Sequence, residues 1–460
     1  MNRIRPFFHR TFAALVLVAL ATSLAIGQPT QAADQSLVFE ALGLLQTHYV
    51  DPVDPVKLLN AAITAMRTQL SNAGVGVDLA EISPGVTDGE ARRLFTDRFT
   101  TAAAMSVGSV TRTQLAYAAI RGMTDSFKDS HTGFLTPQLN AERRLRQRGQ
   151  AGFSGVGIIL LPKDGRFYVS TVIPGGPAEA AGVHDFDRIV KVNDVSSGGL
   201  TVDQVSGIIR GPTGTPVTLT LQRPGVPDPL VVTIVRAPIV VPAVLKAELL
   251  EGGIGYIKLY QFVERTGRDV RASITRLLAQ GMRVMVLDLR GNSGGFLSEL
   301  KDVMNALLPP GTPGYTEMQR GRPPRVVPTV GTPLLPASIP LVVLVDEGSA
   351  SAAELLAAAI RESRRGQLVG ERTSGAVEAS VVFDLSSGCE VVAISQTPVC
   401  PALSITTFRL ATGRGVRLEG AGVEPDIQVA LTTADLEAGV DRPLGAALSV
   451  ARQVIAQQVR

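Results

Sequence analysis

The stretch from Leu341 to Glu362, LVVLVDEGSASAAELLAAAIRE, constrains the fold of this chain more than any other. It begins with an apolar run, Leu341–Val345, that is typical of a buried strand, and it ends in an Ala/Leu-rich run that predicts a helix. The turn between them holds Ser349 and Ser351. Free N–H groups at a helix N-terminus favour negative charge, and small neighbours leave room for a ligand. A serine there is either a nucleophile or a helix N-cap, and these residues alone favour the N-cap.

The same alternation of strands and helices surrounds this stretch. Strands are predicted at Gly255–Leu259, Val284–Leu289 and Ile339–Val345, and helices at Arg268–Gln280 and Leu297–Leu307. Such a crossover pattern places a site at the carboxyl ends of the strands. Gly294 and Gly295 follow one of these strands, so their N–H groups could approach a developing oxyanion; a tight turn is the alternative.

The rest of the chain divides into regions with different secondary-structure patterns. Residues 34–148 carry mostly helical periodicity. Between Gly152 and Arg236, short β-rich runs separated by Gly/Pro turns predict one small β module; the runs are Phe167–Val172, Ile189–Val192, Val217–Gln222 and Leu230–Val235, with a helix at Thr201–Ile209. After the core, an antiparallel set is predicted at Val381–Phe383, Val391–Ser395 and Leu403–Thr407, followed by helical sequence interrupted near Pro443.

The N-terminus is typical of a targeting segment. Basic residues precede an apolar run, Phe12–Ile26, and Met1–Ala33 as a whole has the layout of a signal peptide. We therefore expect a periplasmic or secreted protein; an uncleaved segment would instead attach the chain to a membrane. In an oxidising compartment Cys389 and Cys400 could form a disulfide, and two free buried thiols are the alternative.

Composition excludes several classes of function. The net charge is only +3, tryptophan is absent, and no block of Lys/Arg indicates a nucleic-acid partner. The two cysteines have no nearby histidine to complete a metal site. No metal or organic cofactor is implied.

A serine nucleophile needs a base, and the histidines are few. They are His9, His48, His131 and His184. His131 lies in a polar turn with Asp129 and Ser130, and an unperturbed histidine titrates near neutrality, as a general base should. A solvated turn histidine is the alternative. No lysine follows Lys301.

Several strings together resemble the carboxyl-terminal processing peptidase and tricorn-core superfamily of serine peptidases. They are Phe153-Ser154-Gly155-Val156-Gly157-Ile158, Val172–Gly182 and Asp187–Asn193, which are PDZ-like, and Gly255-Tyr256-Ile257, Asp288-Leu289-Arg290 with Gly294-Gly295, Gly348–Glu354 and Gly420–Asp426, which resemble the catalytic core. The resemblance runs from about Leu37 to about Val429, and the order of the strings carries it.

This resemblance implies a multi-domain α/β protein with a ClpP/crotonase-like peptidase core, an inserted β-rich PDZ domain and an N-terminal helical region. The expected divisions are a signal peptide at 1–33, the helical region at 34–148, the PDZ domain at 149–238, the serine peptidase core at 239–432 and a C-terminal helix at 433–460. Ser351 would be the nucleophile, with an oxyanion hole from Ala352 and Gly294 or Gly295. The loop of Gly155, Val156, Gly157 and Ile158 would bind peptide C-termini.

One departure changes the mechanism that the resemblance implies. Processing peptidases carry a lysine base in a Thr-x-Gly-Lys setting, and the matching string here ends in Ala376. The tricorn-like branch uses a Ser-His pair and a glutamate instead, for which Ser130, His131 and Glu419 are the candidates, with Glu378 a poorer choice. We therefore expect a serine endopeptidase that cleaves C-terminal or unfolded protein segments. A catalytically inactive PDZ scaffold is the alternative.

Overall fold

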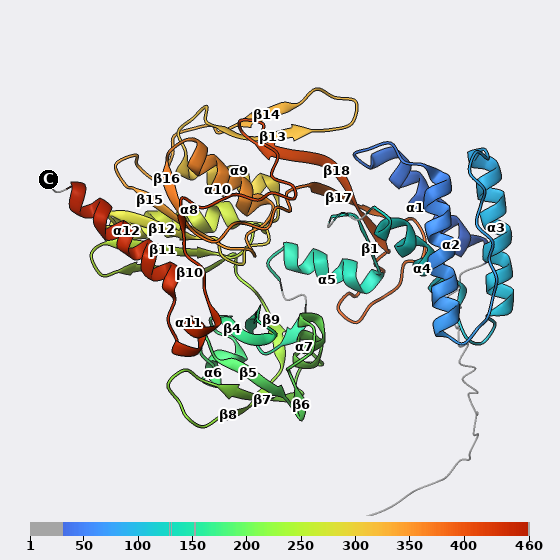
Figure 1. The fold of residues 1–460 in the computed structure, drawn as a ribbon, viewed down its shortest axis with the longest axis horizontal. Coiled ribbons are helices and arrows are strands. Elements are labelled where there is room, and N and C mark those ends of the chain that lie inside the picture. Colours follow the sequence, from blue (N-terminus) through green and yellow to red (C-terminus); the bar gives the residue numbers. More distant parts are fainter. Residues whose placement is uncertain (1–30, 128, 130, 151–152, 459–460) are drawn as a thin grey trace, which may run out of the picture.

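The computed structural model describes residues 31–127, 129, 131–150 and 153–458. The predicted targeting segment therefore lies almost entirely outside the described residues. Figure 1 shows a helical N-terminal part, a small β module and an α/β core. Within the described ranges, no helix is long and apolar enough to cross a bilayer.

The N-terminal part is a helical bundle that packs onto the core. Its helices are α1 (Gln31–His48), α2 (Pro55–Asn72), α3 (Asp88–Met105) and α4 (Arg112–Asp125). Leu403 and Ile405 of the core join the apolar cluster of the bundle. The region predicted as helical also contains a strand, β1 (Gly133–Leu135), which pairs antiparallel with β18 (Ala402–Thr412). This pairing fixes the turn that carries His131 against the core.

Helix α5 (Pro137–Gln147) leads into the β module. All the strands and the helix that the sequence predicts there form, within two residues of the expected bounds. The main sheet has the order β3-β4-β5-β7-β8, made of β3 (Ile158–Lys163), β4 (Arg166–Val172), β5 (Arg188–Val192), β7 (Pro216–Gln222) and β8 (Leu230–Val235), with β6 (Val195–Ser196) beside β5. The helices are α6 (Pro177–Ala180) and α7 (Val202–Ile209), and β2 (Phe153–Gly155) pairs with β9 (Ala237–Ile239) at the base of the module.

The core is built on a six-stranded sheet of order β10-β11-β12-β15-β16-β19. The strands are β10 (Val244–Leu250), β11 (Ile254–Leu259), β12 (Val284–Asp288), β15 (Leu341–Val345), β16 (Gly366–Gly370) and β19 (Ile427–Gln428), and only β10 runs antiparallel to its neighbour. Because side chains alternate along a strand, each strand contributes buried side chains to both faces of the sheet. One face packs on α8 (Thr266–Ala279), α9 (Leu297–Leu307) and α10 (Ala352–Glu362), and the other on α12 (Arg442–Gln458).

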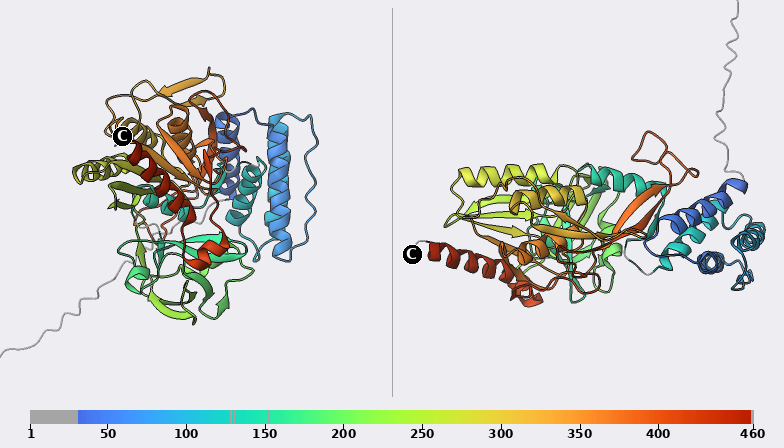
Figure 2. Two further views of the ribbon diagram at one scale, coloured as in Figure 1. Left: turned by 60° about the vertical axis from the view of Figure 1, so that its left-hand side comes forward. Right: turned by 90° about the horizontal axis from the view of Figure 1, so that it is seen from above.

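A second, antiparallel sheet joins the core to the helical bundle. It contains β13 (Pro313–Met318), β14 (Arg325–Pro328) and β17 (Ala379–Asp384) around β18, and Figure 2 shows it extending from the core toward the bundle. The strand predicted at Val391–Ser395 is wrong. This segment lies in the loop that the Cys389–Cys400 disulfide closes, where a single bridge, Glu390 with Val399, is the local pairing.

The C-terminal segment holds two helices. α11 (Thr433–Ala438) is followed by α12, and Pro443 is the second residue of α12. Proline is tolerated in a first helical turn because its missing N–H has no intrahelical partner there. The interruption therefore lies just before the proline rather than at it.

Candidate active site

The two serines of the β15–α10 turn have different environments. Ser349 is fully buried, and its hydroxyl donates to the carbonyl oxygen of Leu289 at 2.8 Å while accepting the N–H of Asp346 at 3.0 Å. A hydroxyl so committed holds the turn to the end of β12. Ser349 is therefore structural.

Ser351 occupies the N-cap position of α10, but not with the backbone of an ordinary N-cap. Its φ is 54° and its ψ is −116°, whereas N-cap residues usually lie in the extended region. A non-glycine residue in such a conformation costs about 1–3 kcal/mol and persists only where its surroundings impose it. The residue is partly exposed. A strained, accessible serine at a helix N-terminus is the geometry of a nucleophile turn.

The buried carboxylate of Glu354 imposes this conformation. Its Oε2 accepts the N–H groups of Ser351 and Ala376, both at 3.0 Å. Its Oε1 accepts the Thr373 hydroxyl at 2.6 Å and the Gly375 N–H at 2.7 Å. One side chain thus joins the serine to the segment 373–376.

The glycine pair lies directly against Ser351. A Cβ on Gly294 would stand 2.6 Å from the Cβ of Ser351, and one on Gly295 would stand 2.1 Å from the carbonyl oxygen of Phe262. Their φ values are 92° and 140°. Only glycine fits at either position.

The N–H groups of Gly294 and Gly295 differ in whether they already have a hydrogen-bond acceptor. Gly294 donates to Oδ1 of the buried Asn292 at 2.8 Å, so its N–H is already bonded. Within the described part of the chain, the N–H groups of Gly295 and Ala352 have no acceptor. Of the predicted oxyanion residues, Gly295 and Ala352 therefore offer donors, and Gly294 offers space.

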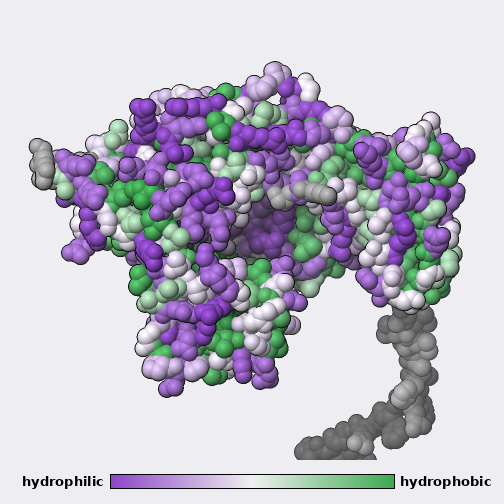
Figure 3. Space-filling view, viewed as in Figure 1, coloured by the Kyte–Doolittle hydropathy of each residue, from purple (hydrophilic) through white to green (hydrophobic). Residues whose placement is uncertain are grey.

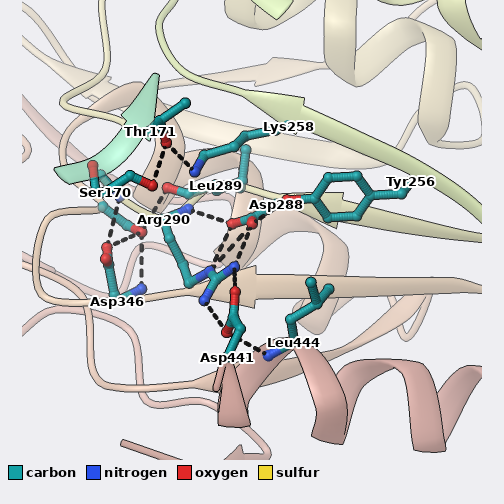
Figure 4. A network of polar contacts seen from close by, with 12 residues as sticks. Ser170, Thr171, Tyr256, Lys258, Asp288, Leu289, Arg290, Asp346, Asp441 and Leu444 are labelled. Carbon is teal, nitrogen blue, oxygen red and sulfur yellow. Dashed lines mark hydrogen bonds and ion pairs between the residues drawn. The ribbon is translucent and has the colours of Figure 1, made fainter. Parts of the chain in front are cut away.

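A buried ionic network lies at the end of β12 (Figure 4). Arg290 donates to Asp288 at 2.7 Å and to Asp441 at 2.7 Å, and the Tyr256 hydroxyl donates to Asp288 at 2.7 Å. Burial alone would raise the pKa of Asp288, but the Arg290 guanidinium outweighs it and brings that pKa down to about 2. Beside it, Lys258 reaches Thr171 of the β module at 2.7 Å.

His131 is held to the core by Asp129. The Asp129 carboxylate accepts the N–H groups of His131 and Thr132, and it also accepts the hydroxyls of Thr406 at 3.1 Å and Tyr49 at 3.0 Å. Since Thr406 belongs to β18, the turn is fixed to the antiparallel sheet. Ser130 lies outside the described residues.

The electrostatic surroundings of His131 favour a neutral ring. Burial lowers the pKa of its imidazole, while the carboxylates of Glu419, Asp129 and Glu354 act in the opposite direction without cancelling the effect. A neutral imidazole near pH 7 can accept a proton.

The two candidate glutamates are bonded differently. Glu419 accepts the N–H groups of Val377 at 2.8 Å and Glu378 at 3.3 Å, and it is the largest charge acting on His131. Glu378 is buried and is paired with Arg409 at 3.6 Å and with Arg417 at 3.7 Å. Glu419 is therefore the better placed to stabilise an imidazolium.

The predicted peptide-binding loop follows β2. The carbonyl oxygens of Val156 and Gly157 accept the N–H groups of Ala178 and Ile173. The N–H groups of Val156 and Gly157 themselves have no acceptor among the residues that the structure describes. Such a pair of free donors is suited to a carboxylate. No cluster of three metal-ligating side chains was found in the described ranges.

Sequence reasoning missed Glu354, Asn292 and Asp129 as organising residues. Ser351 and Glu354 have the Ser-x-x-Glu spacing of a capping box, a signal that could have identified the carboxylate. Asn292 also donates to the Leu259 carbonyl oxygen, and Asp129 accepts the Thr406 hydroxyl; no local pattern predicts these contacts with distant strands.

Two segments of the chain match the models of known protein families. Residues 253–429 match the model of peptidase family S41, and residues 168–223 match a PDZ domain. A carboxy-terminal-processing protease of Bartonella bacilliformis is 33% identical over 333 residues, which cover 71% of this chain and 72% of the relative. A chloroplastic C-terminal processing peptidase of Tetradesmus obliquus is 33% identical over 348 residues, covering 72% and 71%. The solved structure of a photosystem II D1 C-terminal processing protease superposes with a TM-score of 0.53 at 28% identity, covering 86% of this chain and 93% of that one.

Proposed function

Because this chain belongs to the carboxy-terminal processing proteases of peptidase family S41, we propose that it is a PDZ-containing serine endopeptidase with Ser351 as nucleophile and His131 as base. The observation that carries the proposal is the strained Ser351 backbone, held by Glu354 against Gly294 and next to two free N–H donors. An ordinary N-cap has an extended backbone, whereas the Ser351 backbone has φ 54° and ψ −116°.

The proposed reaction is acyl transfer. His131 takes the proton from Ser351 Oγ as that oxygen attacks the scissile carbonyl carbon, and the N–H groups of Gly295 and Ala352 bind the resulting oxyanion. The imidazolium then gives its proton to the leaving amine, and water hydrolyses the acyl-enzyme by the same path. The Glu419 carboxylate stabilises the imidazolium that forms in each half-reaction.

Ala376 is the reason for assigning the base to His131. In the family pattern a lysine follows Thr-x-Gly, and the corresponding residue here has a methyl side chain that accepts no proton. Its backbone is nevertheless at the site, since its carbonyl oxygen accepts the Ser351 N–H at 2.8 Å. The same residue favours a second candidate function, a pseudopeptidase that binds peptides through its PDZ domain.

The substrate class follows from the PDZ domain. An extended peptide would add as a strand beside β3, with its terminal carboxylate at the N–H groups of Val156 and Gly157. We infer that the substrates are protein C-termini or unfolded segments. Periplasmic or secreted location is part of the proposal, supported by the segment 1–33 and by the Cys389–Cys400 disulfide, which suits an oxidising compartment.

Cleavage of casein tests the proposal. The unmodified chain should cleave it, and Ser351→Ala and His131→Ala should each abolish cleavage. His184→Ala, which changes an exposed histidine of the PDZ domain, is the matched control and should leave cleavage intact. Cleavage by both active-site variants would refute the mechanism, and no cleavage by the unmodified chain would favour the pseudopeptidase.

A further inference from the structure

The segment that leaves α1 is bonded to the core next to the His131 turn. Tyr49 directly follows α1, and its N–H donates to the carbonyl oxygen of Leu45 at 3.1 Å. The N–H of the next residue, Val50, donates to the carbonyl oxygen of Thr406 in β18 at 2.8 Å. Figure 1 shows α1 where the helical bundle meets the core, and Figure 3 shows a hydrophilic hollow between the bundle, the PDZ domain and the core. The end of α1 is therefore anchored to the strand that also holds the His131 turn.

The Tyr49 side chain contacts this turn at two places. Its ring lies against the Phe127 ring, with the centroids 4.1 Å apart and the planes tilted by 37°. Its hydroxyl donates to Oδ2 of Asp129 at 3.0 Å. Phe127 is two residues before Asp129, and His131 is two residues after it. One side chain from the bundle thus holds the turn through an apolar contact and through a hydrogen bond.

The two oxygens of the Asp129 carboxylate have different partners. Oδ1 accepts the N–H groups of His131 and Thr132, at 2.9 and 2.5 Å, and the hydroxyl of Thr406 at 3.1 Å. The Tyr49 hydroxyl donates to the other oxygen, Oδ2. Because Oδ1 holds the backbone of the turn and Tyr49 holds Oδ2, the Tyr49 hydroxyl fixes the rotation of the carboxylate.

Carboxylates surround the Tyr49 hydroxyl. Burial raises the pKa of Tyr49, and nearby negative charges raise it further; they belong to Asp129, Glu378 and Asp51. Arg409, a cation beside this group, is paired with Asp51 and with Glu378. The hydroxyl therefore stays protonated near neutral pH and stays a donor to Asp129.

The Asp129 charge acts on the imidazole of His131. Burial alone would raise the pKa of Asp129, but the hydrogen bonds from Thr132 and His131 outweigh it and keep the carboxyl ionised. Burial lowers the pKa of His131. Three carboxylates act in the opposite direction, and they are Glu419, Asp129 and Glu354. Since a hydrogen bond to a carboxylate spreads its negative charge, loss of the Tyr49 donor should strengthen the effect of Asp129 on the ring.

We propose that Tyr49 is a positioning residue for the reaction: its hydroxyl fixes the Asp129 carboxylate and thereby the turn that presents His131 to the active site. The inference rests on the proposed role of His131 as the base. It gives the helical bundle a part in catalysis, because a residue at the end of α1 acts on the base of a site in the core.

Tyr49→Phe tests this proposal, because it keeps a ring against Phe127 and removes only the hydroxyl. The titration of His131 is followed by NMR on the full chain with isotope-labelled histidines, and the His131→Ala variant identifies its signal. We expect Tyr49→Phe to raise the titration midpoint of His131 by about 0.3 pH units or more. In a peptide-cleavage assay, kcat should fall about tenfold, which is roughly the effect of losing one hydrogen bond to a charged group. KM should stay unchanged, since Tyr49 lies outside the PDZ domain.

Tyr117→Phe is the matched control. Tyr117 is another tyrosine of the bundle, and its ring lies 4.9 Å from that of Phe134, in the strand that follows the His131 turn. Its hydroxyl is turned toward the disulfide-closed loop, 3.6 Å from where a Cβ on Gly388 would stand. This substitution should change neither the His131 midpoint nor kcat.

A Tyr49→Phe variant with an unchanged His131 midpoint would overturn the proposal, and so would a variant with an unchanged kcat or with a change in KM alone. The titration requires no cleavage, so it separates this inference from the proposed function. A shifted midpoint in a chain that cleaves no peptide would refute the proposed function and would still support the action of Tyr49 on His131.

Discussion

Replacing Glu354 with glutamine should both destabilise the peptidase core and impair the site. The Glu354 carboxylate accepts four hydrogen bonds, three of them from backbone N–H groups. Glutamine has the same shape but presents an NH₂ group in place of one oxygen. Whichever way the amide is turned, at least one backbone N–H then faces another donor.

The magnitude follows from the cost of an unsatisfied buried donor, about 1–3 kcal/mol, and from the loss of a charged acceptor. We expect a loss of roughly 2 kcal/mol in the free energy of unfolding of the core. For a domain of the size of the matched region, 253–429, this corresponds to about 4–8 °C in Tm. Because Ser351 would no longer be held in its strained conformation, kcat should fall by tenfold or more.

Differential scanning calorimetry and a peptide-cleavage assay would measure the two effects. The matched control is Glu347→Gln in the same turn, where the side chain is 68% exposed and its contact with Lys163 is 3.6 Å long. That variant should change stability by less than about 0.5 kcal/mol. A Glu354→Gln variant with the Tm and kcat of the unmodified chain would show that the Glu354 carboxylate does not keep Ser351 in its strained conformation.

Three further predictions concern the chemistry. Since burial lowers the pKa of His131 and the neutral ring is the base, kcat/KM should rise with pH with a midpoint below 6.5 and then stay level; an alkaline midpoint would indicate a different base. Gly295→Ala should lower kcat at least 100-fold, because a Cβ would meet the Phe262 carbonyl oxygen at 2.1 Å, whereas Gly445→Ala, with open space around it, should have no effect; equal activities would contradict the oxyanion assignment. In a His131→Ala background, Ala376→Lys should restore measurable cleavage with an alkaline pH profile, and no recovery would count against the placement of residue 376 beside the nucleophile.

The elements nearest the site could be predicted because their signals are local. Five consecutive apolar residues in β15 are all buried, and the helix that follows begins at Ala352, as the Ala/Leu-rich run indicates. The choice of Ser351 over Ser349 came from the family resemblance. The structure adds the physical reason, which is the burial of the Ser349 hydroxyl.

The remaining parts depend on contacts between distant segments. β1 pairs with β18 although the two strands are separated by about 270 residues in the sequence, as Gly133 and Ser404 show. No local periodicity predicts a pairing between such distant segments. This pairing is what brings the His131 turn to the core. The strand predicted at Val391–Ser395 does not form, although its residues have strand propensity. Inside the disulfide-closed loop there is no neighbouring strand with which it could pair.

The activation of Ser351 by His131 is the central claim, and labelling with diisopropyl fluorophosphate tests it most directly, without any assumption about substrate. Intact-mass and peptide-mapping spectrometry of the unmodified chain should show one adduct, on Ser351, that is lost in the His131→Ala variant. An adduct that forms at the same rate without His131, or on a different serine, would contradict the account.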